Sequence, residues 1–351
     1  MSPTSRALTP APSEAGSGVS ADPANFAPPA LLRHHHLQSL LTQAPWRRYR
    51  IRQRARALLA AAQSRIIDCG DGVSLQGYQS DPPGRTRGQV VLLHGWEGSA
   101  DSTYLLSIGT ALFAAGFSVF RLNLRDHGDT HGLNEGLFHS CRIDEVHSAV
   151  ARIRELSEPR FFALVGQSLG GNFALRVAAR AAGRGPDIDR VIAVCPVLKP
   201  HHTMHALDNG LWIYRRYFLA RWRRSLTAKA ACFPRLYSFG DLRRFPTLTA
   251  TTEYFVERFT EFANIDDYLN GYALTGDVLA DVRIPTRVVL AADDPIIPAA
   301  DLELLARPQA LEVCLADFGG HCGFVDRLLG PSWIDRQIVA DLERACQAAL
   351  A

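Results

Sequence analysis

The sequence predicts an α/β fold in which helices cover both faces of a mostly parallel central sheet. Three observations predict it. Short apolar runs rich in β-branched residues alternate with longer segments of helical periodicity. In the stretch GQSLG, a serine stands between two glycines where one such run gives way to a helical segment. One long segment rich in aromatic residues interrupts the alternation and is expected to form a helical cap.

The expected strands are continuous apolar runs, which are typical of strands buried on both faces of a sheet. They cover residues 89–93, 117–123, 160–165, 190–195, 287–292 and 311–316. The expected helices cover residues 103–115, 142–157, 169–182, 299–306 and 332–350. Upstream, Asp71-Gly72 separates two segments of alternating polarity and predicts a β-hairpin.

The aromatic segment between Cys195 and Arg287 is too long for a connecting loop. We expect a cap at about residues 199–270, inserted above the carboxyl ends of the strands, where open α/β sheets bind ligands. Residues 1–25 are rich in Pro, Ser, Ala and Gly, so we expect a disordered tail there. Residues 26–351 are then expected to form one domain, as their length permits.

Composition limits the function classes and the compartment. The 38 basic and 35 acidic residues leave a formal net charge of +3, too balanced to indicate nucleic acid as the main partner. The seven cysteines form no Cys-x-x-Cys pair and are expected to be reduced thiols. Since no run reaches the roughly 18 apolar residues of a spanning helix and no signal peptide is evident, we expect a cytoplasmic protein.

The stretch Gly166 to Gly170 matches Gly-x-Ser-x-Gly, with Ser168 at its centre. In a strand-to-helix turn this motif holds the serine in a strained backbone conformation and exposes its hydroxyl at the strand end. The flanking glycines are needed because a Cβ there would collide with the neighbouring strand or helix. Ser168 is therefore the candidate nucleophile, and the alternative is a glycine-rich turn without chemistry.

A serine nucleophile needs a histidine base and a carboxylate that orients it. Asp293 and Asp294 follow one expected strand and His321 follows the next, so the chain order is Ser, Asp, His. We expect Asp294 to be the acid because Pro-Ile-Ile-Pro after it makes it the residue entering the turn, with Asp293 as the alternative. Chain order favours His321 over the histidines on other loops, His94, His127, His131 and His139.

An acyl-transfer site also needs donors for a tetrahedral oxyanion. The strand at 89–93 ends in His94-Gly95, after which the backbone N–H of Trp96 can turn inward. We pair it with the N–H of Leu169, the residue after the candidate nucleophile. The alternative is a plain tight turn. The sequence contains neither Gly-x-Gly-x-x-Gly nor a P-loop.

These motifs resemble those of the α/β-hydrolases, and more narrowly of the YheT-like serine esterases. The resemblance runs from about Phe26 to the C-terminus and rests on LLHGWEGS, GQSLGGN, AADDPIIP and FAPPALLRHHHLQSLL, which holds a His-x-Gln-Ser element at residues 36–39. It implies carboxylic ester hydrolysis without a metal or organic cofactor. It also implies Ser168 as nucleophile, His321 as base and one of the paired aspartates as acid.

The chain departs from this pattern in two places. Many relatives have Arg-Gly-x-Gly where this chain has Arg125-Asp126-His127-Gly128, a change that could reshape the pocket rim. The animal members begin with a membrane anchor that we do not expect here, so a membrane-embedded substrate is not expected either.

Three further features of the sequence each allow a functional interpretation and a purely structural one. The six arginines between residues 47 and 56 could contact an anionic membrane surface, but a solvated face is favoured. The aromatic residues of the cap could line an acyl-chain pocket or simply pack: Trp212, Tyr214, Tyr217, Phe218 and Trp222. The histidine clusters at 34–36 and 201–205 lack ligand partners at a known spacing, so no metal site is predicted.

The sequence thus predicts a serine hydrolase that cleaves a small-molecule or lipid-like ester through an acyl-enzyme. The alternatives are an acyltransferase with the same residues and a non-catalytic ligand-binding protein of this fold. The oligomeric state is not predicted.

Overall fold

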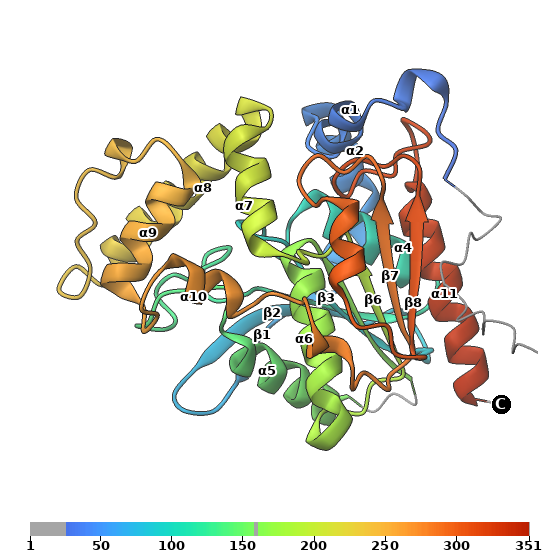
Figure 1. The fold of residues 1–351 in the computed structure, drawn as a ribbon. Coiled ribbons are helices and arrows are strands. Elements are labelled where there is room, and N and C mark those ends of the chain that lie inside the picture. Colours follow the sequence, from blue (N-terminus) through green and yellow to red (C-terminus); the bar gives the residue numbers. More distant parts are fainter. Residues whose placement is uncertain (1–25, 158–160, 351) are drawn as a thin grey trace, which may run out of the picture.

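The computed structural model describes residues 26–157 and 161–350, so the expected disordered tail lies outside the described residues. Its centre is an eight-stranded sheet with the strand order β1-β2-β4-β3-β5-β6-β7-β8 (Figure 1). The strands are β1 (Ala62–Asp68), β2 (Ser74–Ser80), β3 (Gln89–Leu93), β4 (Ser118–Leu122), β5 (Phe162–Gln167), β6 (Arg190–Val194), β7 (Thr286–Ala291) and β8 (Leu311–Ala316). The predicted fold class is confirmed.

Neighbouring strands are parallel from β4 to β8, whereas β2 runs antiparallel to both of its neighbours. Each of the six predicted strands is present within two residues of its expected bounds. The predicted hairpin joins β1 to β2. Gly70, Asp71 and Gly72 all have a positive φ there, as tight turns between antiparallel strands require.

Two layers of helices cover the sheet. Helices α2 (Pro45–Arg54), α3 (Arg56–Ala60), α4 (Thr103–Ala114) and α11 (Trp333–Leu350) pack together on one face, and α5 (Ile143–Leu156) and α6 (Leu169–Arg184) cover the other (Figure 1). Short helices α1 (His35–Leu41) and η1 (Ala30–Leu32) precede them. Both faces bury continuous apolar clusters. Among the described residues, none of the helices combines the length and the apolarity needed to cross a bilayer.

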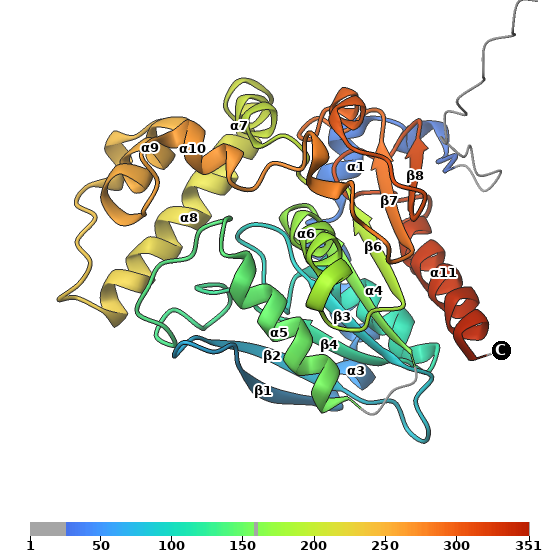
Figure 2. The ribbon, with the colours of Figure 1, turned by 60° about the horizontal axis from the view of Figure 1, so that its bottom comes forward.

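Four helices lie between β6 and β7, and we call residues 200–270 the insertion. They are α7 (Pro200–Asn209), α8 (Trp212–Cys232), α9 (Leu248–Phe259) and α10 (Ile265–Asn270), with the short η2 (Leu242–Arg244) between α8 and α9. Figures 1 and 2 show them together at one end of the molecule, away from α11. Their apolar residues continue the cluster under α5 and α6, so the insertion packs on the domain.

The segment expected to be helical at 299–306 is instead the 3₁₀ helix η4 (Ala299–Leu304), and another short one is η3 (Asp277–Leu279). The backbone at the end of η4 bonds across to Gly276, which donates to Leu304 O and accepts from Ala306 N. These bonds use groups that a longer α-helix would need for itself.

Candidate active site

Ser168 lies in a sharp turn between β5 and α6, with φ of 54° and ψ of −120°. Such a conformation costs a non-glycine residue about 1–3 kcal/mol and persists only where its surroundings hold it. Here the N–H of Ser168 donates to Val194 O at 2.9 Å. A Cβ at Gly166 would lie 2.1 Å from the carbonyl oxygen of Gly170, and one at Gly170 would lie 2.3 Å from that of Leu93. Both glycines are thus required by close packing.

Three side chains from distant segments meet at this turn. The Oγ of Ser168 lies 3.0 Å from Nε2 of His321. The Nδ1 of the same imidazole lies 2.9 Å from Oδ2 of Asp294. Ser168 follows β5, Asp294 follows β7 and His321 follows β8, so the carboxyl ends of three parallel strands bring them together. The structure therefore joins the three predicted residues in one hydrogen-bonded chain.

The two neighbouring aspartates make different contacts. Asp294 turns its second oxygen to the backbone N–H groups of Ile296 and Ile297, at 2.8 and 3.0 Å, which fixes the carboxylate. Asp293 instead accepts from the N–H of Gly320 at 2.8 Å. It holds the loop that carries His321 without touching the imidazole.

The surroundings of His321 favour its protonated form. Burial lowers the pKa of the imidazole, but the negative charges of the Asp294 carboxylate and a Cys322 thiolate outweigh burial, so the pKa of His321 lies well above its ordinary value. Nδ1 keeps its proton toward Asp294 in the neutral form, which leaves the lone pair of Nε2 facing Ser168. This tautomer suits a base that takes the serine proton.

The two predicted backbone donors lie beside Ser168. Leu169 is the first residue of α6, so its N–H has no intrahelical acceptor. Gly95 packs closely against Ser168, since a Cβ at Gly95 would lie 3.1 Å from Cβ of Ser168. The turn at Trp96, which follows Gly95, therefore lies close to the hydroxyl. Within residues 26–157 and 161–350, no acceptor is found for the N–H of Trp96.

Two buried histidines hold the loop that carries Trp96, a role that the sequence does not reveal. His94 Nδ1 lies 2.8 Å from Gly95 O, and its Nε2 accepts from Leu124 N at 3.1 Å. His127 likewise accepts from Glu97 N at 3.1 Å. Burial lowers the pKa of His94 to about 4 and that of His127 well below its ordinary value, so both rings are neutral acceptors. His127 belongs to the segment Arg125-Asp126-His127-Gly128 singled out in the sequence.

The N-terminal segment holds the loop of His321. Gln38 is fully buried, and its amide pairs with both backbone groups of Val325, at 3.0 and 2.7 Å. The hydroxyl of Ser39 accepts from the N–H of His321 at 2.8 Å. These residues belong to the His-x-Gln-Ser element of the sequence, which signalled the family but not this contact. The element therefore positions the loop that carries the imidazole.

Ser168 and His321 open into a cavity of about 80 Å³ between the sheet and the insertion. Its walls are mainly apolar and come from both parts, among them Trp96, Leu207, Phe218, Trp222 and Phe255. The ring of Trp96 stacks on Phe218 at 5.3 Å, which ties the loop after β3 to α8. The arrangement can hold an apolar group next to the hydroxyl of Ser168.

The structure places the other residues singled out in the sequence in different surroundings. Of the cap aromatics, Phe218 and Trp222 line the cavity, Tyr214 packs against His36, and Trp212 and Tyr217 are exposed. Most arginines between 47 and 56 line exposed positions of α2 and α3, except Arg47, which is buried. His131 and His139 contact other parts of the insertion, Ser225 and Glu261.

Comparison with known proteins agrees with this architecture. A family model described as the alpha/beta hydrolase fold matches residues 88–328, more than half of the chain. The curated protein "Putative esterase YheT" of Escherichia coli (strain K12) is 24% identical over 277 residues, which are 77% of this chain and 80% of that protein.

Solved structures share the fold at low identity. The esterase Pf2001 of Pyrococcus furiosus is 15% identical with a TM-score of 0.51, covering 81% of this chain and 92% of its own. A 2,6-dihydroxy-pseudo-oxynicotine hydrolase is 17% identical with a TM-score of 0.53, covering 89% and 80%. The resemblance to YheT expected from the motifs is confirmed, and the chain belongs to the α/β-hydrolase fold family.

Proposed function

We propose that the protein is a serine hydrolase that cleaves carboxylic esters through an acyl-enzyme. Ser168 is the nucleophile, His321 the general base and acid, and Asp294 the residue that orients the imidazole. The observation that carries the proposal is the hydrogen-bonded chain of these three side chains, with separations of 3.0 and 2.9 Å. The name of the Escherichia coli relative supports the same activity.

The reaction would proceed in two halves. Nε2 of His321 takes the proton of Ser168 as Oγ attacks the ester carbonyl, and the protonated imidazole then gives that proton to the leaving alcohol. Asp294 stabilises the imidazolium by its charge. Water, activated by the same ring, releases the acid from Ser168. The N–H groups of Trp96 and Leu169 would bind the oxyanion, and each such donor is worth about 3–4 kcal/mol.

The cavity indicates the kind of substrate. Its volume of about 80 Å³ is below the roughly 300–1,000 Å³ typical of ligand sites, so we expect short acyl groups to be preferred. Its walls favour an apolar chain. The insertion then acts as a cap that selects the acyl group. We further propose a cytoplasmic location, which the seven free cysteines support.

The decisive variant is Ser168→Ala. We expect it to lose hydrolysis of p-nitrophenyl acetate and butyrate by about 10⁵-fold or more, because no other group replaces the nucleophile. A fluorophosphonate probe should label the wild type and leave the variant unlabelled.

The matched control is Ser64→Ala, since Ser64 is exposed on β1. It should keep both turnover and labelling. Full labelling of the Ser168→Ala variant would refute the proposed nucleophile, and an unreactive wild type would favour a binding protein of the same fold.

A further inference from the structure

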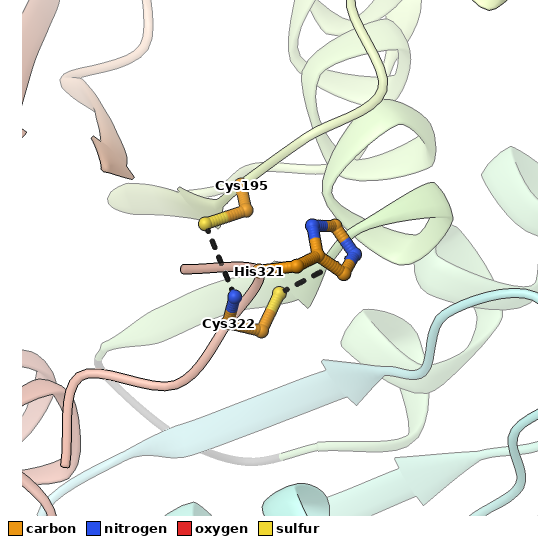
Figure 3. A group of neighbouring side chains, drawn as sticks. All are labelled: Cys195, His321 and Cys322. Carbon is orange, nitrogen blue, oxygen red and sulfur yellow. Dashed lines mark hydrogen bonds between the residues drawn. The ribbon is translucent and has the colours of Figure 1, made fainter. Parts of the chain in front are cut away.

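Two cysteines lie beside the imidazole of His321. The Sγ atoms of Cys195 and Cys322 and a ring nitrogen of His321 all lie within 4.8 Å of one another. Figure 3 shows the three side chains where the chain after β6 meets the loop after β8. Among the residues that the structure describes, no other group of three such ligands comes as close together.

The backbone holds both thiols in place. Cys195 and Cys322 have φ of 43° and 57°, in the left-handed region that non-glycine residues rarely adopt. The N–H of Cys322 donates to Sγ of Cys195 at 3.4 Å. Cys195 is fully buried and Cys322 is half-buried, so the pair lies under the surface, beside the His321 ring that lines the cavity of Ser168.

This donor set has the chemistry of a zinc site. Zn²⁺ prefers thiolate and imidazole ligands, at about 2.3 Å to sulfur and about 2.0–2.1 Å to nitrogen. A tetrahedral ion with these bond lengths sets its ligand atoms about 3.6–3.8 Å apart. Sγ of Cys322 lies 3.9 Å from Nε2 of His321, so this pair needs almost no movement. The other separations, bounded by 4.8 Å, need to close by about 1 Å at most.

The surroundings would also support a bound ion. Histidine ligands of metals usually donate their other ring N–H to a carboxylate, which orients the ring. Asp294 already accepts such a bond from Nδ1 of His321 at 2.9 Å. The N–H of Cys322 could stabilise the negative charge of a Cys195 thiolate.

We propose that Cys195, Cys322 and His321 bind Zn²⁺ and that the bound ion inhibits the enzyme reversibly. Each thiol gives its proton to solvent as its sulfur coordinates. Nε2 then coordinates through the lone pair that otherwise accepts the proton of Ser168, so the ring cannot act as the base. Water or Oγ of Ser168 would complete the tetrahedron. The inhibition rests on the proposed function, whereas the binding does not.

The binding is tested with Cd²⁺, because its thiolate complexes absorb in the near ultraviolet and histidine clusters give no such band. On titration with Cd²⁺, the wild type should develop this absorption band and reach its end point at one ion per chain. The Ser168→Ala variant should develop the same band. Mutation of a residue that only hydrogen-bonds to a metal ligand typically lowers metal affinity by about 10–100-fold. Cys195→Ser and Cys322→Ser remove a ligand itself, so each should weaken Cd²⁺ binding by at least that factor.

The controls distinguish binding by Cys195 and Cys322 from binding by other thiols, and loss of a ligand from misfolding. Cys232→Ser removes an exposed thiol and should leave the titration unchanged. Far-ultraviolet circular dichroism checks the fold of each variant, and the half-buried Cys322 gives the variant less prone to unfolding. An unchanged titration in folded Cys322→Ser would overturn the site.

The inhibition is tested on p-nitrophenyl acetate hydrolysis with ZnCl₂, each variant being compared with its own metal-free rate. Zn²⁺ should inhibit the wild type, EDTA should restore the rate, and Cys322→Ser should need at least about tenfold more Zn²⁺. Binding of Cd²⁺ without inhibition by Zn²⁺ would refute the inhibitory role. A wild type inactive without metal would contradict the proposed function, and the cadmium titration would still decide the site.

Discussion

The rim of the sheet and the insertion hold their side chains in different ways. At the rim, backbone geometry fixes Ser168, through a φ of 54° and glycines packed against neighbouring carbonyls. In the insertion, side chains fix one another, as Trp222 does with Phe255 at 5.6 Å. Backbone constraints leave little freedom, whereas aromatic packing accommodates changes of size. On the proposed function, the rim would carry the chemistry and the insertion would select the substrate.

One buried ion pair links the two regions. The fully buried Lys229 of α8 donates to Asp126 at 2.7 Å and to the carbonyls of Asn134 and Gly136 at 2.6 and 3.0 Å. Asp126 stands in the segment Arg125-Asp126-His127-Gly128. This segment therefore anchors the insertion through Asp126 and holds the loop of Trp96 through His127.

Among the variants that test this comparison, Asp294→Asn at the rim is expected to have the largest effect. Because the amide can donate to Nδ1 and force the wrong tautomer, we expect kcat to fall by about 10⁴-fold with little change in stability. Asp293→Asn keeps an oxygen for the N–H of Gly320 and should cost about tenfold or less. Steady-state kinetics on p-nitrophenyl butyrate compares the two, and the reverse order would exchange their roles.

The pH profile provides a second measurement of the same pair. Only the neutral imidazole accepts the serine proton, so activity is lost as the pH falls through the pKa of His321. Asp294 raises that pKa, which places the acid limb of kcat/KM above pH 6.5 in the wild type. The limb of Asp294→Asn should lie at lower pH, and an unmoved limb would contradict the assignment of Asp294.

Lys229→Met tests the anchor. Removal of the ammonium leaves the carboxylate of Asp126 buried without its partner, and breaking such a pair costs about 3–5 kcal/mol. We expect that loss in the free energy of unfolding, measured in urea, together with faster proteolysis within residues 200–270. The double variant Lys229→Met/Asp126→Asn should recover part of the stability. A single variant as stable as the wild type would show that packing alone holds the insertion.

The smallest effect is expected from Phe218→Ala in the insertion. Shortening this side chain enlarges the cavity, so the ratio of kcat/KM for octanoate to that for butyrate should rise by about tenfold while butyrate turnover persists. The matched control is Trp212→Ala on the same helix, because Trp212 is 60% exposed and outside the cavity. An unchanged ratio would mean that the insertion does not select the acyl chain.

The sequence predicted the parts of the site that depend on local geometry. A strand, a glycine-flanked serine and a helix in immediate succession determine the turn at Ser168, because steric limits on φ and ψ act over a few residues. The position of Asp294 at the entry to its turn likewise favoured it over Asp293, and the structure turns Asp294 to His321. Parallel strands then explain why the segments meet, since their carboxyl ends share one edge.

Only the tertiary structure decided the long-range contacts other than those among Ser168, Asp294 and His321. Cys195 and Cys322 are separated by 127 positions, and Gln38 and Val325 by 287. Such contacts depend on the path of the whole chain and leave no periodic pattern in the sequence. The same holds for the pairing of Lys229 with Asp126 and for the walls of the cavity. Short-range backbone sterics can be read from neighbouring residues, whereas long-range packing exists only once the chain has folded.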